Sequence, residues 1–371
     1  MIRFHIPISE VSAVAITVHY PGRACLLGEH CDWAGGASLT VPLEQGIQVC
    51  AEPAQRDLAV ATTLEGRVLE GHWDLCGKVD PEGGPLRFVP AAVAALRSRR
   101  IVVPPVQLRV TSDLPPGRGL SSSAAFCVAI LDALTQHAGC SLERNELASL
   151  ATHVERDLLG VACGPLDPLA CVAEEPILLR WGLQGSVAIE PIHPALELHL
   201  VVGSFAAPRD TPTILRVLQE HALNERRAAH DPQAVAAVRE ALAIFAIEAE
   251  QGAAALRCGD PAALGLAMNR CQHAYDQMAT EVPVLHAPAL RQAVLGLRQG
   301  KALGAKFSGA GGDGSVIALY AAPDDARRAQ EWLSHQGGCC AWTCTIQHSQ
   351  PPPRLIRTLA SSLSPNTPAD V

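Results

Sequence analysis

The sequence predicts a mixed α/β (α+β) protein of two domains. Its 371 residues suffice for two domains and a large core, and its content of 48% hydrophobic and 18% charged residues is typical of a compact globular chain. Apolar runs of strand length alternate with longer runs of helical periodicity. A strand over residues 196–202 follows the loop near His193-Pro194. We therefore predict a first domain over residues 1–194 and a second over residues 195–349.

In the first domain, strand patterns alternate with Ala-rich helical ones. Strands are predicted over residues 13–20, 39–41, 46–51 and 107–110, with short strands and turns between residues 57 and 84. Helices are predicted over residues 88–99, over residues 126–134, and from a cap at Ser141 to Glu155.

In the second domain, a row of helices separates the first strand from the later ones. Helices are predicted over residues 213–222, 235–257, 261–278, 289–297 and 324–335, and strands over residues 302–307, 315–320 and 341–347. The Pro- and Ser-rich tail, residues 350–371, is predicted to be loose.

Charge and composition favour a small-molecule partner. The net charge is −8 and no Lys/Arg-rich run is present, which argues against nucleic acid and anionic membranes as partners. No apolar run approaches the ~20 residues that span a bilayer, and the N-terminus has no leader pattern, so we expect a cytoplasmic protein. The 13 cysteines are odd in number and scattered, as expected for reduced thiols. The cluster of Cys339, Cys340, Cys344 and His348 lacks paired metal-ligand spacing.

A Gly- and Ser-rich turn lies where a strand is followed by a helix. The stretch Leu114-Pro115-Pro116-Gly117-Arg118-Gly119-Leu120 precedes Ser121-Ser122-Ser123 and an apolar helix. A helix start carries unpaired N–H groups and partial positive charge, and glycines let the backbone approach a polyphosphate. The pattern therefore indicates an anion site, although an ordinary N-capped turn has the same composition.

Two further polar segments are candidates for a pocket. Arg23, Glu29, His30 and Asp32 lie beside glycines between two predicted strands, where carboxylates could accept hydrogen bonds from several hydroxyls. A solvated hairpin loop is the alternative. Glu155, at a predicted helix end, and Asp167, after a Cys-Gly-Pro break, could point into one cleft or lie on the surface like most carboxylates.

A second glycine-rich stretch, residues 308–314, matches G-x-G-x-x-G. A strand follows it rather than a helix, so a dinucleotide-binding assignment fails on context.

These segments, in this order, resemble the GHMP kinase superfamily over nearly the whole chain. PGRACLLGEHCDWAGG is similar to the first motif of that superfamily, LPPGRGLSSSAA to the second, and GAKFSGAGGDGSVIAL to the third. The first motif is most similar to that of galactokinases, PGRxxLxGEHxDYxGG, and ERDLLGVACGPLD matches the galactokinase stretch that carries the catalytic aspartate. The resemblance implies an ATP- and Mg²⁺-dependent kinase with a ribosomal-protein-like N-terminal domain, a ferredoxin-like C-terminal domain and a site between them.

The resemblance also implies residue roles. Asp167 would be the base and Arg23 its electrostatic partner. Sugar hydroxyls would be held by Glu29, His30, Asp32 and Gly164. The ATP phosphates would be wrapped by Pro116, Gly117, Gly119, Leu120, Ser121, Ser122, Ser123 and Ala124, with Gly309, Gly311 and Gly312 closing the site. Magnesium would be held near Ser122, Ser123 and Glu155.

Several departures from the galactokinase pattern bear on the substrate. Trp33 replaces a Tyr, Asp313 stands where the third motif usually has Gly, the run Ala207-Pro208-Arg209-Asp210-Thr211 is more similar to mevalonate kinases, and MNRCQHAYDQM lacks a Ser-His pair. Three functions follow: a kinase of the anomeric hydroxyl of galactose or a related sugar, which we favour; a kinase of another alcohol such as mevalonate; or a catalytically silent sugar sensor. A monomer or a homodimer is expected.

Overall fold

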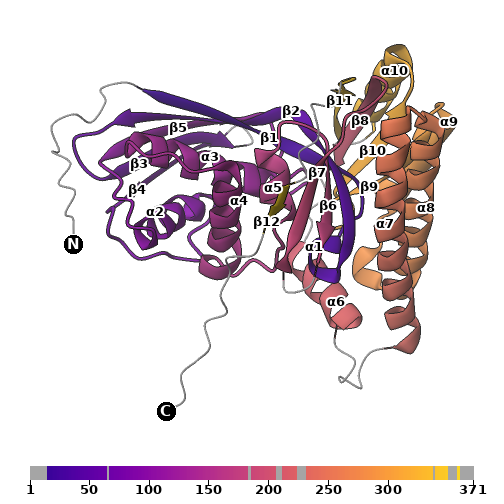
Figure 1. The fold of residues 1–371 in the computed structure, drawn as a ribbon, viewed down its shortest axis with the longest axis horizontal. Coiled ribbons are helices and arrows are strands. Elements are labelled where there is room, and N and C mark those ends of the chain that lie inside the picture. The colour runs from indigo at the N-terminus through magenta and orange to yellow at the C-terminus, as the bar shows by residue number, and fades with distance from the viewer. Residues whose placement is uncertain are drawn as a thin grey trace. The chain divides into compact units, whose positions relative to one another are not determined.

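The computed structural model describes residues 15–64, 67–182, 185–205, 211–223, 231–336, 339–349 and 357–359 (Figure 1). The described residues form two compact units. One unit takes residues up to Arg23 together with Pro42–Glu174, and the other takes Ala24–Val41 together with the residues from Glu175 onward. The chain thus enters the second unit early, for the segment that carries the first motif. The predicted limits of the two kinase domains remain a prediction.

The first unit combines a sheet with a group of helices. Its elements are the first part of β1 (Ile16–Leu27), the second part of β2 (Gly36–Pro53), β3 (Leu58–Leu64), β4 (Arg67–Trp73), η2 (Pro85–Arg87), α2 (Phe88–Ser98), β5 (Val106–Ser112), α3 (Ser122–His137), α4 (Arg144–His153), the π-helical turn η3 (Val154–Leu158) and α5 (Leu166–Val172). The strand order is β2-β5-β3-β4, with β3 parallel to β5 and the other pairs antiparallel. Helix α3 packs against α2, α4 and α5, and most of its residues are buried.

The second unit contains a four-stranded sheet, three further strands and a long helical pair. Its elements are α1 (Cys31–Ala34), β6 (Ile177–Trp181), β7 (Val187–Pro191), β8 (Leu198–Phe205), α6 (Thr211–Leu223), α7 (Pro232–Cys258), α8 (Pro261–Glu281), η5 (Pro283–Leu285), α9 (Pro288–Gln299), β9 (Gly304–Ser308), β10 (Ser315–Tyr320), α10 (Pro323–Ser334), β11 (Cys339–Ile346) and β12 (Arg357–Leu359). Helices α7 and α8, drawn in orange, lie side by side in Figure 1.

The sheet of β8 to β11 confirms the ferredoxin-like prediction. Its order is β11-β8-β10-β9 and all pairs are antiparallel, while the chain order is strand, helices, two strands, helix, strand. Every residue of β8, β9 and β10 is buried, so this sheet forms the core of the unit. The mixed α/β fold class predicted from the sequence is observed.

Some predicted boundaries were wrong. β1 continues through the PGRACLL segment to Leu27, so Arg23 lies on a strand rather than in a loop, and the two strands expected over residues 39–51 are one strand, β2. Helix α4 is capped by Glu143 in a capping box with Glu146, and not by Ser141. The pattern missed β6, β7 and α5.

Three further predictions concern the cysteines, membrane-spanning helices and segments that lie partly outside the described residues. All 13 cysteines are free thiols, as expected. No helix in the described part of the chain is long and apolar enough to cross a membrane. Residues 207–210 of the run similar to mevalonate kinases lie outside the described residues, as does the predicted tail apart from residues 357–359, whose strand pairs with β7.

Asp313, one of the departures from the family motif, caps a helix. Its Oδ1 accepts a hydrogen bond of 2.9 Å from the backbone N–H of Leu290, in the first turn of α9. The residue at the cap position of that helix, Ala287, offers no side-chain acceptor. Asp313, although distant in sequence, therefore satisfies a first-turn N–H of α9 as an N-cap side chain would.

We expect Asp313→Ala to lower the free energy of unfolding by about 1 kcal/mol, the usual effect of losing a cap. Asp313→Asn keeps an acceptor oxygen at the same place and should recover most of the loss. Urea denaturation of the three proteins measures the difference. Equal unfolding midpoints for Asp313→Ala and the wild type would contradict the capping role.

Candidate active site

The glycine-rich turn of the first unit has the geometry of an anion site. It connects β5 to α3, and left-handed backbone at Gly117 (φ +67°), Gly119 (φ +79°) and Ser121 (φ +60°) bends it back on itself. Ser121 stands at the cap position of α3, yet no side chain caps that helix start. The first-turn N–H groups of Ser122, Ser123 and Ala124 thus have no capping side chain, and the N-capped-turn alternative is not what forms.

Ser121 carries backbone strain at this turn. A left-handed φ is uncommon for a residue with a Cβ, and such strain concentrates at functional sites. The residue is only 5% exposed, and its buried Oγ has no hydrogen-bond partner among the described residues. A buried hydroxyl without a partner is costly, so the geometry suits a ligand that supplies one.

A cavity of about 300 Å³ adjoins the same turn. Gly117, Ser122 and Ser123 form one part of its wall, and the remaining wall is mostly apolar, with Leu69, Val110, Phe88 and Phe126 among the lining residues. The rings of Phe88 and Phe126 meet edge to face with centroids 6.0 Å apart. This combination of an apolar wall and a few polar groups is typical of small-molecule pockets.

Arg23 joins the predicted base to the glycine turn. Its Nε and Nη2 donate to Oδ1 of Asp167 at 2.9 and 2.5 Å, and its Nη1 donates to the carbonyl of Gly119 at 2.8 Å. The Arg23 side chain is 4% exposed and that of Asp167 is 35% exposed. A buried guanidinium with several fixed bonds holds the carboxylate in one orientation while leaving it open on one side.

Glu155 lies buried on the π-helical turn η3, a kind of helix irregularity common at functional sites. Burial raises the pKa of Glu155 to about 7; a hydrogen bond with Ser123 and the charge of Arg87 oppose the rise, and the charge of Asp167 adds to it. The carboxyl is therefore close to half-ionised near neutral pH. It sits beside Ser123, one of the two serines that were predicted to lie near magnesium with it.

The second unit holds three of the four predicted substrate residues. Glu29 and His30 are buried in the turn after β1, and Asp32 is half-buried in the short helix α1. Gly28 (φ +83°) makes this turn possible, since a Cβ there would lie 2.1 Å from the carbonyl oxygen of Ala37.

Glu29 has a protein partner that the sequence did not reveal. The Nζ of Lys306, a residue of β9, donates to Glu29 Oε1 and to the carbonyl of Phe307, and both side chains are almost fully buried. Lys306 thus occupies one oxygen of a carboxylate that was predicted to accept hydrogen bonds from ligand hydroxyls.

The third motif forms a left-handed glycine loop between β9 and β10. Gly309, Gly311 and Gly312 have φ values of +86°, +92° and +70°. The N–H of Gly312 donates to the hydroxyl of Tyr275 on α8 at 2.8 Å. Since L-residues avoid these φ values, glycine is required at these positions.

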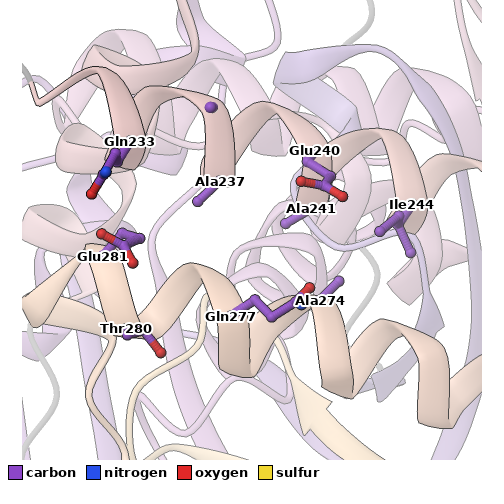
Figure 2. A pocket seen from close by; sticks show the side chains of 10 residues that line it. Gln233, Ala237, Glu240, Ala241, Ile244, Ala274, Gln277, Thr280 and Glu281 are labelled. Atoms are coloured by element: carbon purple, nitrogen blue, oxygen red, sulfur yellow. The ribbon is translucent and has the colours of Figure 1, made fainter.

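The larger cavity, about 530 Å³, lies elsewhere in the second unit, between α7 and α8. Figure 2 shows side chains from both helices around it, with Gln233 and Glu240 on one side and Gln277 and Glu281 on the other. Its lining includes none of the predicted site residues, all of which the structure describes.

Within the first unit, the structure brings together Arg23, Asp167 and the glycine turn, and separately Ser123 and Glu155. Gly164 lies buried in the loop before α5. Sequence reasoning missed three residues: Lys306 and Tyr275, in contact with predicted site residues, and Arg87, which lines the pocket. Lys306 lies inside the stretch that is similar to the third motif, so its position there could have marked it as a candidate site residue.

The pKa of Glu155 predicts a pH-dependent stability. Between about pH 4.5 and pH 7 the folded protein keeps a proton that the unfolded chain has lost, so this residue lowers the free energy of unfolding as the pH rises through that range. Without divalent cations, the free energy of unfolding of Glu155→Gln should exceed that of the wild type by about 1–3 kcal/mol between pH 5 and pH 8. Urea titrations at several pH values measure this, with the exposed Glu331→Gln as control. Parallel profiles for Glu155→Gln and the wild type would show that Glu155 is ionised throughout.

Two family patterns match the chain. The pattern described as GHMP kinases N terminal domain matches residues 87–175, and that described as GHMP kinases C terminal matches residues 253–339. A galactokinase of Thermotoga maritima is 30% identical over 156 residues, covering 42% of this chain and 43% of the relative. A galactokinase of Mycobacterium tuberculosis is 34% identical over 165 residues, covering 43% and 45%. The chain thus aligns with less than half the length of these curated relatives.

Solved structures share the fold over most of the chain. Lactococcus lactis galactokinase complexed with galactose has a TM-score of 0.72 at 18% identity, covering 90% of this chain and 93% of that one. L. major mevalonate kinase in complex with R-mevalonate has a TM-score of 0.70 at 21% identity, covering 91% and 97%. At these identities the likeness concerns the fold. Both domain patterns match in order along one chain with this fold, which confirms the predicted resemblance to the GHMP kinase superfamily.

Proposed function

We propose that the protein transfers the γ-phosphoryl group of ATP to a hydroxyl of a small molecule, and that the acceptor is a monosaccharide. The observation that carries this proposal is the bridge that Arg23 makes between Asp167 and the glycine turn. A single buried cation there fixes the distance between a candidate base and a candidate phosphate site. Phosphoryl transfer depends mainly on such positioning.

The nucleotide is proposed to bind at the turn and its cavity. The uncapped start of α3 and the strained Ser121 suit the phosphates, and the adjoining apolar cavity suits the base. Arg87 also lines the cavity, and its buried Nε has no partner among the described residues, so it could donate to a ring nitrogen or a phosphate. A Streptococcus pneumoniae phosphomevalonate kinase of 17% identity and TM-score 0.70 was solved with AMPPNP. That complex supports a nucleotide role for the shared fold.

Glu155 and Ser123 fit a magnesium ion. A carboxylate and a hydroxyl are oxygen donors of the kind Mg²⁺ prefers, and Mg²⁺ commonly takes only one or two protein ligands, with phosphates and water completing its shell. No group of three or more His, Cys, Asp or Glu residues that could form an all-protein cage occurs in the described ranges. The ion would neutralise charge on the phosphates.

In the proposed reaction, Asp167 accepts the proton of the acceptor hydroxyl, whose oxygen attacks the γ-phosphorus. The new O–P bond replaces the bond to the β-phosphate oxygen, and ADP leaves with that electron pair. Arg23 holds Asp167 in place and offsets negative charge near the transferring group. An anomeric hydroxyl is more acidic than an ordinary alcohol, which reduces the demand on the base.

Asp32 and His30 are proposed to bind the acceptor's hydroxyls. The relatives named galactokinase support a sugar, and the mevalonate kinase fold supports the second candidate, a non-sugar alcohol. A screen of purified protein for ADP release with monosaccharides and mevalonate tests the proposal. If none of the acceptors in the screen supports ADP release, neither candidate is favoured and the proposed kinase reaction is overturned.

We expect Asp167→Asn to lose turnover by a factor of about 10²–10⁴ while binding ATP as the wild type does, because the amide cannot accept the proton and the glycine turn is unaltered. Asp157→Asn is a matched control, since Asp157 also pairs with an arginine but is exposed. Steady-state kinetics and nucleotide titration measure the two effects. Wild-type turnover in Asp167→Asn would remove Asp167 from the base role.

We expect Asp32→Ala to reduce kcat/KM for the true sugar by a factor of about 10–100, since a lost buried hydrogen bond to a charged group costs ~1.5–3 kcal/mol. ATP affinity should stay unchanged. A deoxy sugar lacking the matching hydroxyl should lose less in the variant than in the wild type. Equal losses in both backgrounds would show that Asp32 does not contact that hydroxyl.

A further inference from the structure

Helix α8 presents a polar stripe to the unpaired edge of a sheet. β9 is the edge strand of its sheet, so one side of its backbone has no strand partner. Asn269 and Gln272, one helical turn apart, supply that partner. The Nδ2 of Asn269 donates to the carbonyl of Leu303 and its Oδ1 accepts from the N–H of Ala305, while Oε1 of Gln272 accepts from the N–H of Phe307 at 2.8 Å.

Tyr275 continues the stripe beyond the strand, into the glycine loop. Its hydroxyl accepts from the N–H of Gly312 at 2.8 Å and donates to the carbonyl of Leu285 at 2.8 Å. Its ring stacks on Phe307, with centroids 4.2 Å apart and an interplanar angle of 30°. The side chain is 1% exposed. Ring and hydroxyl are therefore fixed independently of the loop, and the loop takes its place from them.

The ring also limits what the loop can be. A Cβ on Gly311 would lie 2.8 Å from Cε2 of Tyr275, so the loop backbone lies directly against the ring. Three left-handed glycines lose much conformational entropy on ordering, and a buried hydroxyl that accepts one of their N–H groups opposes that loss.

We propose that Tyr275 is a positioning residue that holds the loop Gly309–Gly312 in its nucleotide-binding form. The proposal rests on the proposed function. Its consequence is that the N–H of Gly312 is committed to Tyr275, so Gly312 contributes to the site by the shape of the loop and not as a phosphate donor. The helix segment MNRCQHAYDQM, which departs from the galactokinase pattern, thereby gains a role in the third motif.

Tyr275→Phe tests this role, because it removes the hydroxyl and keeps the ring. The matched control is Tyr320→Phe: Tyr320 is also 1% exposed, but its hydroxyl has no hydrogen-bond partner among the described residues. We expect Tyr275→Phe to raise KM for ATP about tenfold, with KM for the acceptor within twofold of wild type, and Tyr320→Phe to change neither. Unchanged KM for ATP in Tyr275→Phe, or equal rises for both substrates, would overturn the proposal.

Hydrogen exchange gives a readout that needs no kinase activity. The amides of residues 309–314 should exchange at least tenfold faster in folded Tyr275→Phe than in the wild type and in Tyr320→Phe. If the variant does not fold, the Gly312 amide of the nucleotide-free wild type should still be protected. Fast exchange of that amide in the wild type, or equal exchange in both variants, would refute the positioning role. A protein that shows these exchange differences but releases no ADP would contradict only the proposed function.

Discussion

The buried guanidinium of Arg23 is the interaction on which the candidate site of the first unit depends. It bonds the Asp167 carboxylate and the Gly119 carbonyl at once, and a guanidinium can do so because its donors are fixed in one plane. Its backbone N–H also donates to the carbonyl of Leu120. β1 therefore acts as the support for the glycine turn, and the continuation of β1 to Leu27 is what brings Arg23 there. An Arg23→Lys exchange would keep the charge and lose this geometry.

The glycine loop of the second unit, Gly309–Gly312, has different neighbours from the turn of the first unit. The N–H of Gly312 in this loop donates to the buried hydroxyl of Tyr275 on α8, and on the preceding strand Lys306 pairs with Glu29. A buried ion pair stabilises a fold little in net terms, but removing one partner leaves an uncompensated charge. The first and third motifs of this unit are thus tied together, and a substitution in either is expected to disturb both.

The sequence predicted most of the longer helices, most strands of the core and the two glycine segments, because periodicity and glycine spacing are local signals. It did not predict the partners of those segments. Glu29 and Lys306 are 277 positions apart, and Asp313 caps a helix that begins 25 positions before it. Such contacts arise from tertiary packing, which no local pattern encodes. The same reason explains why β1 and β2 are longer than predicted. The PGRACLL segment and the residues between 41 and 46 have weak strand patterns, and pairing in the sheet overrides that local preference.

The Lys306 pairing also changes the argument about the acceptor. Two carboxylates at the first motif, Glu29 and Asp32, would repel an anionic acceptor unless a cation intervenes. Lys306 neutralises Glu29, so only one negative charge remains at this motif and repulsion is correspondingly weaker. Charge then discriminates poorly between a neutral sugar and a hydroxy acid. If Asp32 and His30 bind the acceptor as proposed, selection would fall to their hydrogen bonds, which favour acceptors according to the number and placement of their hydroxyl groups.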